Sequence, residues 1–340
     1  MWFHFNKSKF YDTEFNTISN LLKSYFKSID VAIKTEYKEN FKKIQDYFKK
    51  SQNCSKSIRK FNNYFLKTSI QEREKIKEIV NNNLKIENYL IDYESFISYN
   101  DLTKNKYEFS KEFVKILINL DTDIWKYLSN KDNGSIKKQY YEMLYNSLDN
   151  KICCPFCGIN TLKNTKFSGK LSPLEHFIPK SKYPFVAWNT DNIFLSCEEC
   201  NSKKGSKTLK EKKSNFFPLG FDTNSKIKLK LISYDLIIEE DSSINTDNCK
   251  IEFISKNISL CNFNEYLSTW NHLFSIKNRL KESLISHIIT EETKFKKKKR
   301  SNPNFDFLTD IEVELEEAEK DGNIIEVAYL EYKKNEIENN

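Results

Sequence analysis

The chain has 340 residues, 39% of them hydrophobic and 14% aromatic, which is typical of a globular protein and excludes a largely disordered one. No stretch approaches the roughly 18 consecutive apolar residues of a membrane helix, so we expect no membrane partner. The N-terminal residues show no apolar segment followed by a small-residue cleavage site, and we therefore expect a cytoplasmic protein rather than a secreted one.

The net charge of +7 is distributed unevenly along the chain. Residues 151–213 contain 12 Lys against 5 acidic residues, whereas residues 306–340 contain 12 acidic residues against 3 Lys. A basic segment is what a polyphosphate partner requires, so the first of these regions favours contact with a nucleic acid. For any single lysine, a solvated surface position is the competing interpretation.

The first 133 residues contain neither Gly nor Pro, and nine of the twelve Gly and Pro residues of the chain lie between residues 155 and 220. Apolar residues spaced three or four apart predict helices in the Gly- and Pro-free part. Asp12 or Thr13 is a suitable N-cap for the first helix, and Ser69 with Glu72 forms a capping-box pattern. The predicted helices cover residues 13–50, 55–66, 69–84, 110–120 and 136–148, with a turn at Asn133 and Gly134 between the last two.

The part after residue 220 predicts a mixed structure. Alternating polar and apolar residues indicate strands at 226–232 and 250–254, and helical spacing returns at 264–289 and 309–320. The basic run at 294–300 suits phosphate contact, but we expect an exposed flexible linker there. We thus predict an α+β, mostly α-helical protein with an N-terminal helical domain (1–149), a central module (150–220) and a C-terminal mixed extension (221–340) with an acidic tail.

Four of the eight cysteines form two Cys-x-x-Cys pairs, Cys154 with Cys157 and Cys197 with Cys200. Each pair can offer two thiolates to one ion, and two pairs complete a tetrahedral zinc site without an open position. The sequence therefore predicts a structural Zn²⁺ site that joins both ends of a turn-rich segment. Cys153 is a possible alternative to Cys154, but the spacing favours Cys154. Buried free thiols are expected at the remaining positions, Cys54, Cys249 and Cys261.

Polar residues stand between and directly after these pairs in a fixed order. Glu175 and His176 precede Pro179, Asn192 follows, and Asn201 and Lys204 come directly after the last cysteine pair. This order resembles the signature of the HNH endonucleases, the zinc-braced ββα-metal nucleases, and the resemblance covers residues 154–205. Taken alone, a Glu-His pair is more often structural and an asparagine such as Asn192 is often only a turn residue; the zinc pairs around them favour the catalytic interpretation.

The resemblance implies a role for each of these residues. His176 is the expected general base, which suits an imidazole that titrates near neutral pH. Glu175 and Asn201 are expected to hold a divalent metal ion, and Asn192 to keep the His176 ring or its backbone in register. Lys204, with Lys203 as a weaker candidate, is expected to contact a phosphate. Because this chain has Glu and Asn where the family often has Asp and His, both metal ligands are oxygens, which favours Mg²⁺ or Mn²⁺.

The implied activity is metal-dependent hydrolysis of DNA phosphodiester bonds, with RNA as an open alternative. The competing hypothesis is a non-catalytic zinc-ribbon subunit that binds nucleic acid or acts as a scaffold. The segment also resembles the HNH subunits of bacterial anti-phage defence systems such as the Septu nuclease, which works beside an SMC-like ATPase. That resemblance implies an antiviral role with a partner ATPase, and we expect the N-terminal helices to bind a partner or to mediate self-assembly. Sequence specificity, strandedness and the activating signal stay open.

Overall fold

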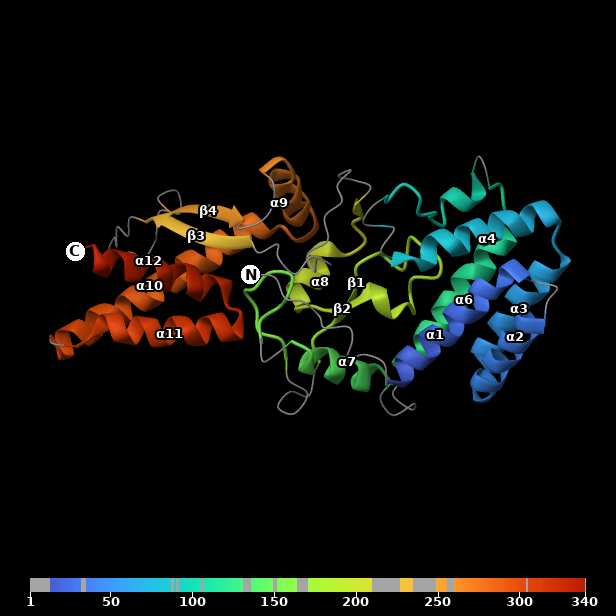
Figure 1. Cartoon of the computed structure of the whole chain (residues 1–340), viewed down its shortest axis with the longest axis horizontal. Helices are drawn as coiled ribbons and strands as arrows, with labels where there is room; N and C mark the ends of the chain where they lie inside the picture. Colours follow the sequence, from blue (N-terminus) through green and yellow to red (C-terminus); the bar gives the residue numbers. More distant parts are fainter. Residues whose placement is uncertain are drawn as a thin grey trace.

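A computed structural model describes residues 13–31, 35–86, 89, 92–104, 107–130, 136–148, 152–163, 171–209, 227–234, 249–255, 260–303 and 305–339. Over these residues the protein is mostly helical, with two small antiparallel sheets of two strands each, which confirms the predicted fold class. Figure 1 shows three parts along the long axis: the N-terminal helices at one end, the small β1–β2 sheet with α8 in the centre, and the C-terminal elements at the other end. None of the helices described is long and apolar enough to cross a membrane.

The N-terminal part is a helical assembly in which the single helix expected over residues 13–50 is wrong. The first helix ends at Lys27, a short 3-10 turn follows, and a second helix starts at Thr35. Tyr25 and Tyr37 stack across the two helices at a ring distance of 5.6 Å, so the chain folds back on itself. The apolar spacing continues through the break because both helices bury an apolar face. The helices are α1 (Glu14–Lys27), α2 (Thr35–Tyr47), α3 (Gln52–Lys67), α4 (Ile70–Leu84), α6 (Lys111–Ser129) and α7 (Ile136–Asn146).

The predicted helix starts are confirmed where the structure describes them. The Thr13 hydroxyl accepts a hydrogen bond from the backbone N–H of Asn16 at 3.3 Å and caps α1. Ser69 and Glu72 form both hydrogen bonds of a capping box at the start of α4. These side chains satisfy backbone donors that a helix N-terminus otherwise leaves without partners. Asp12 and the expected turn at Asn133 and Gly134 lie outside the described residues.

The C-terminal part combines a two-stranded sheet with four helices. Strands β3 (Ile227–Ser233) and β4 (Lys250–Ser255) pair antiparallel, as predicted. The helix expected at 264–289 is instead divided between α9 and α10 at Ser275, whose φ of 53° interrupts regular helical geometry. The helices are α9 (Leu260–Phe274), α10 (Ile276–Ser301), α11 (Phe307–Asp321) and α12 (Ile324–Glu338).

The basic run at 294–300 is not the flexible linker that we expected, because it forms the last turns of α10. The Lys298 ammonium lies 2.6 Å from a carboxylate oxygen of Asp310 and 3.7 Å from one of Glu314, both on α11. The acidic tail thus supplies counter-charges for the basic run.

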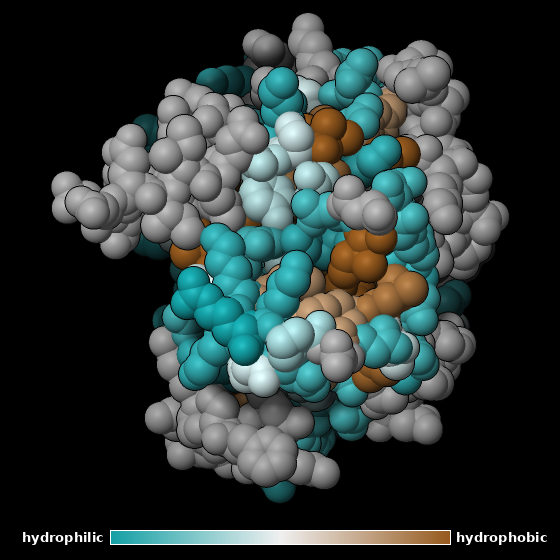
Figure 2. Space-filling model, turned by 90° about the vertical axis from the view of Figure 1, so that its left-hand side faces the viewer, coloured by the Kyte–Doolittle hydropathy of each residue, from teal (hydrophilic) through white to brown (hydrophobic). Residues whose placement is uncertain are grey.

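The end of the molecule formed by this part also carries a groove of about 570 Å³ between β3 and α12, and Figure 2 shows apolar surface among hydrophilic residues on this face.

The central part is held between the other two rather than standing apart from them. The buried apolar side chains of the described residues form one core that includes the N-terminal helices, the central module and the C-terminal helices. The three-domain division therefore stays a prediction, and the contacts that join the parts bear directly on the candidate site.

Candidate functional site

Two short strands and a helix carry the predicted site residues. Strand β1 (Leu174–His176) pairs antiparallel with β2 (Ile193–Leu195), so that His176 lies opposite Ile193. Helix α8 (Glu198–Lys204) follows β2 almost at once, with Cys197 as its N-cap. Glu175 and His176 are therefore on β1, Asn192 directly precedes β2, and Asn201, Lys203 and Lys204 are on α8. The order strand, strand, helix is the one that the sequence resemblance implies.

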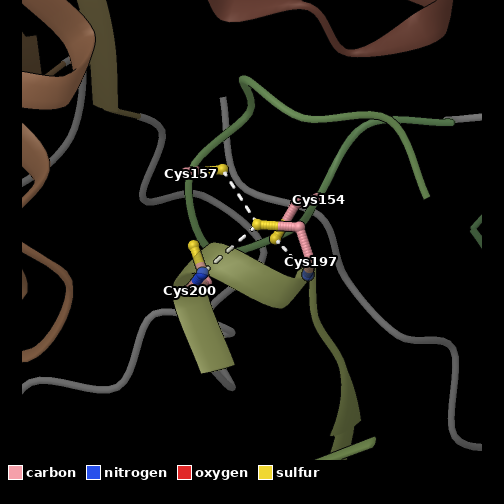
Figure 3. A group of neighbouring side chains, drawn as sticks. All are labelled: Cys154, Cys157, Cys197 and Cys200. Atoms are coloured by element: carbon pink, nitrogen blue, oxygen red, sulfur yellow. Dashed lines mark hydrogen bonds between the residues drawn. The ribbon is translucent and has the colours of Figure 1, made fainter. Parts of the chain in front are cut away.

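The four cysteines of the two pairs meet at one point. All four are buried and their sulfur atoms lie within 4.8 Å of one another, as Figure 3 shows. A tetrahedral zinc site with Zn–S bonds of about 2.3 Å needs sulfur atoms about 3.8 Å apart, and the Cys157 and Cys197 sulfurs are 3.9 Å apart. Cys153 is buried but is not part of the group. The predicted ligand set is thus confirmed as a cluster able to bind zinc.

Hydrogen bonds to the sulfurs favour a thiolate at Cys197, whereas burial raises the pKa of the Cys154 and Cys200 thiols. The backbone N–H groups of Cys197 and Cys200 donate to the sulfurs of Cys154 and Cys197 at 3.3 and 3.4 Å (Figure 3). Hydrogen bonds from the other cysteines, Cys154 first, lower the pKa of the Cys197 thiol. Such donors stabilise the deprotonated form that a metal ion requires. The fit to a structural zinc ion therefore rests on the position of the four sulfurs, together with the donors at the Cys197 sulfur.

One residue at the cluster could not be found from the sequence. The Arg279 guanidinium, on α10, donates to the Cys200 sulfur at 3.3 Å and to Glu199 at 2.8 Å. A bound Zn²⁺ with four thiolates carries excess negative charge, which a guanidinium offsets. Arg279 follows Cys200 by 79 residues, and its helix has no metal-binding motif.

His176 is almost fully enclosed at the end of β1. Its Nε2 lies 2.9 Å from the carbonyl oxygen of Ala187, and its ring meets the Trp125 ring edge-on at 4.5 Å. Burial, followed by the nearby Lys180 ammonium, lowers the pKa of His176 to about 3. The imidazole is therefore neutral at pH 7, and the expectation that His176 titrates near neutral pH is wrong because burial disfavours the charged ring. Because Nε2 faces a carbonyl oxygen, Nε2 carries the proton and Nδ1 the lone pair.

Glu175 is paired with a lysine of the same module. The Lys204 ammonium lies 2.7 Å from Glu175 Oε1 and donates to the carbonyl oxygen of His176 at 2.8 Å, and both side chains are buried. Burial raises the pKa of Glu175, while Lys204 acts in the opposite direction. The structure thus places Lys204 against β1, whereas Lys203 is exposed on α8. Asn201 is half-buried and stands three residues before Lys204 on α8, so the two side chains are neighbours on the helix surface.

Asn192 is fully buried and all its hydrogen bonds described here go to backbone atoms. Its side-chain oxygen accepts from the N–H of Ile178 at 2.6 Å, and its Nδ2 donates to the carbonyls of Ile178 and Val186 at 2.9 and 3.1 Å. These bonds tie the beginning and the middle of the loop that follows β1 to the residue that precedes β2. Since Val186 directly precedes Ala187, Asn192 acts on the His176 partner through the backbone.

A lysine outside the motif stands beside His176. The Lys180 ammonium lies 4.1 Å from the centre of the Trp125 ring, a cation–π contact. Burial and the charge of Lys137 on α7 lower the pKa of Lys180 to about 8. Lys180 is half-buried. In the sequence Lys180 is one of 12 lysines of the segment 151–213 and is not distinguished from the others.

Comparisons with known proteins give a partial match. No family model matches the chain, and no solved structure matches it. Over 120 residues the chain is 29% identical to a curated protein, the Septu protein PtuB of Bacillus thuringiensis. This segment is 35% of the present chain and 44% of the length of PtuB. The chain is therefore similar to part of a Septu protein.

Proposed function

We propose that this protein is a metal-dependent HNH endonuclease that hydrolyses DNA phosphodiester bonds, with His176 as the general base. The observation that carries the proposal is the position of His176: its Nε2 lies 2.9 Å from the Ala187 carbonyl oxygen, which leaves Nδ1 as the ring nitrogen with the lone pair. The Nδ1 lone pair can then take a proton from a water molecule that attacks phosphorus.

Glu175 and Asn201 are the proposed ligands of a catalytic Mg²⁺ or Mn²⁺ ion. Among the described residues the four cysteines are the one group with three or more His, Cys, Asp or Glu ligands. A magnesium site fits this limit, because Mg²⁺ in nucleic-acid enzymes is usually held by one or two protein oxygens, water and substrate phosphate. Lys204 binds Oε1 of Glu175, which leaves Oε2 and the Asn201 amide oxygen as the two oxygen donors. When bound, such an ion stabilises negative charge on the phosphate.

The lysines of the site divide between structural and substrate roles. Lys204 is buried against Glu175, so we assign it the neutralisation of that carboxylate and, with the phosphate present, a contact at the base of the site. Lys203 is exposed and is assigned a contact to the nucleic-acid backbone. Lys180, half-buried beside His176 and Trp125, is the cation best placed to meet the scissile phosphate.

The biological setting is proposed from the similarity to the Septu protein PtuB. We assign the chain to anti-phage defence, with a protein partner such as an SMC-like ATPase or with self-assembly through the N-terminal helices. DNA is the proposed substrate and RNA the alternative, because phosphate contacts do not distinguish them.

The test compares wild type, His176→Ala and His287→Ala on supercoiled plasmid DNA and on matched RNA, with Mg²⁺, Mn²⁺ or EDTA and with or without a partner ATPase. His287 is the control, since it lies on α10 against Tyr329 and away from the proposed base. We expect His176→Ala to lower the cleavage rate about 100-fold or more, the usual contribution of a general base, with zinc content unchanged. Equal cleavage by wild type and His176→Ala would contradict the assignment.

A non-catalytic zinc-ribbon subunit is the second candidate, and one observation favours it. The buried Glu175–Lys204 ion pair already neutralises the carboxylate that the catalytic ion needs. This alternative predicts binding of nucleic acid without cleavage in every divalent metal, and a Lys204→Met variant that gains no metal affinity. Cleavage that depends on both Mg²⁺ and His176 rejects it.

A further inference from the structure

Helix α6 of the N-terminal part presents two side chains to the loop between β1 and β2. Asp121 and Trp125 are four residues apart, so they lie on one face of the helix. Asp121 is buried, and Trp125 is partly buried. Both contact residues of the central module more than fifty positions away. None of the motifs in the sequence includes either of them.

Asp121 fixes the turn that precedes the hydrogen-bond partner of His176. Its carboxylate accepts hydrogen bonds from the backbone N–H of Phe185 at 2.8 Å and from the indole N–H of Trp188 at 2.9 Å. Phe185 has a φ of 68°, a left-handed conformation that is unfavourable for a bulky residue unless the surroundings hold it. The carboxylate thus bridges the two sides of Val186 and Ala187, and the Ala187 carbonyl is the group that faces His176.

Trp125 contacts the same imidazole through its ring. Its ring meets the His176 ring at an angle of 74° and a distance of 4.5 Å, which is an edge-to-face arrangement. The Lys180 ammonium is held 4.1 Å from the centre of the indole. The His176 ring is therefore confined by the Ala187 carbonyl at Nε2 and by the indole of Trp125.

We propose that α6 is part of the catalytic site and that Asp121 and Trp125 are positioning residues, which fix the ring orientation and the Nε2–H tautomer of His176. The catalytic part of this inference rests on the proposed nuclease function. The contacts of Asp121 and Trp125 around His176 do not depend on that function. It gives the N-terminal helices a direct role at the general base, in addition to any partner that they bind. A displacement of α6 would move the Ala187 carbonyl and the indole together.

The experiment measures the His176 tautomer by NMR and the cleavage kinetics in a separate assay. The full-length zinc-loaded protein is labelled with ¹⁵N-histidine; the chain has 4 His, and His176→Ala assigns the signal. Long-range ¹H–¹⁵N spectra at pH 7 then report which ring nitrogen carries the proton. The variants are Trp125→Ala, Trp125→Phe and Asp121→Asn, with the exposed neighbours Thr122→Ala and Lys126→Ala as controls on the same helix.

We expect the Nε2–H tautomer in wild type, in both controls and in Trp125→Phe. Trp125→Ala and Asp121→Asn should give a mixture of tautomers, and kcat should fall about 10- to 100-fold, the effect of a misplaced catalytic group, with KM changed less than about twofold. A Trp125→Ala variant that keeps the wild-type tautomer and the wild-type kcat overturns the proposal. The proposal is also overturned if Trp125→Phe loses the tautomer and kcat to the same extent as Trp125→Ala. If wild type cleaves nothing, the nuclease proposal fails while the tautomer spectra still decide the role of α6.

Discussion

The two flanks of the central module contact different halves of it. The N-terminal helices contact the loop between β1 and β2: Asp121 binds Phe185 and Trp188, and Asn83 donates to the carbonyl of Pro184 at 3.3 Å. The C-terminal elements contact the cysteine pairs: Arg279 binds the Cys200 sulfur, and the Trp270 indole donates to the carbonyl of Phe156 at 2.8 Å. One flank thus stabilises the surroundings of His176, and the other stabilises the metal cluster.

This difference implies that two properties of one small module are supported separately. Strands β1 and β2 have three residues each, too few to hold a site by themselves. The cluster and the base therefore depend on long-range contacts, but on different ones. Substitutions in one flank should change zinc retention or His176 geometry, and not both to the same degree.

Loss of the metal is the largest expected effect. Cys197→Ser removes a ligand whose thiolate also accepts hydrogen bonds from Asn160 and Cys200. Structural zinc contributes about 10–16 kcal/mol, as much as the whole stability of a typical domain. We expect the variant to lose its zinc and the C-terminal helices to lose hydrogen-exchange protection before α1, α3 and α6. Cys153→Ser, a buried neighbour outside the cluster, is the matched control; equal zinc content in both variants would contradict the ligand assignment.

An intermediate effect is expected from Asp121 as the pH changes. Burial raises the pKa of this carboxyl from 3.8 to about 6, against the hydrogen bonds from Tyr99, Phe185 and Trp188 that lower it. The folded protein therefore holds the proton more tightly than the unfolded chain, so the Asp121 contribution to stability is complete below pH 4 and is lost as the pH rises to 6. The shift corresponds to about 3 kcal/mol.

Urea unfolding of wild type and Asp121→Asn at pH values from 4 to 7 measures this contribution. Zinc binding has its own pH dependence, which both proteins share, so the informative quantity is the difference between their free energies of unfolding. We expect the advantage of wild type over the variant to shrink by about 2 kcal/mol between pH 4 and pH 6.5, because at pH 4 part of the contribution is already lost. A difference that is constant over this range would show that Asp121 has an ordinary pKa.

The sequence predicts best those features that depend on residues close together in the chain. The cysteine spacing gave the four ligands, and the Ser69–Glu72 pattern gave the start of α4, because each motif uses local backbone geometry. The helix breaks after Lys27 and at Ser275 were missed because amphipathic spacing continues through them. Neither break has the Gly or Pro that usually marks a helix end.

The surroundings of His176 are unpredictable from the sequence for a different reason. Trp125 and His176 are brought together by the packing of α6 against the loop. From the sequence alone, a tryptophan on an amphipathic helix is assigned to the hydrophobic core. Lys204 shows the same limit: its place in the motif is local, but its contact with Glu175 depends on burial of both side chains. Motif position identifies candidate residues, and only the packing decides what each one contacts.

The smallest expected effect tests the contact between the C-terminal flank and the first cysteine pair. Gly158 has a φ of +65°, and a Cβ atom there would lie 2.8 Å from Ile324 Cγ2 on α12. Gly158→Ala therefore combines backbone strain with a steric clash. Gly205→Ala, at a φ of +48°, would place its Cβ 3.6 Å from the Ser202 carbonyl oxygen, so it introduces backbone strain without a clash. Only the Gly158 variant should be coupled to Ile324.

A double-mutant cycle with Ile324→Ala separates the two terms, because that change removes Cγ2 and leaves the backbone strain in place. We expect Gly158→Ala to destabilise the protein by about 1 kcal/mol less in the Ile324→Ala background than in wild type, while Gly205→Ala costs the same in both. Chemical unfolding supplies the free energies, and zinc retention against a chelator should follow the same order. Additive effects at Gly158 would mean that α12 does not press on the cysteine pair, and the C-terminal flank would then act on the cluster mainly through Arg279 and Trp270.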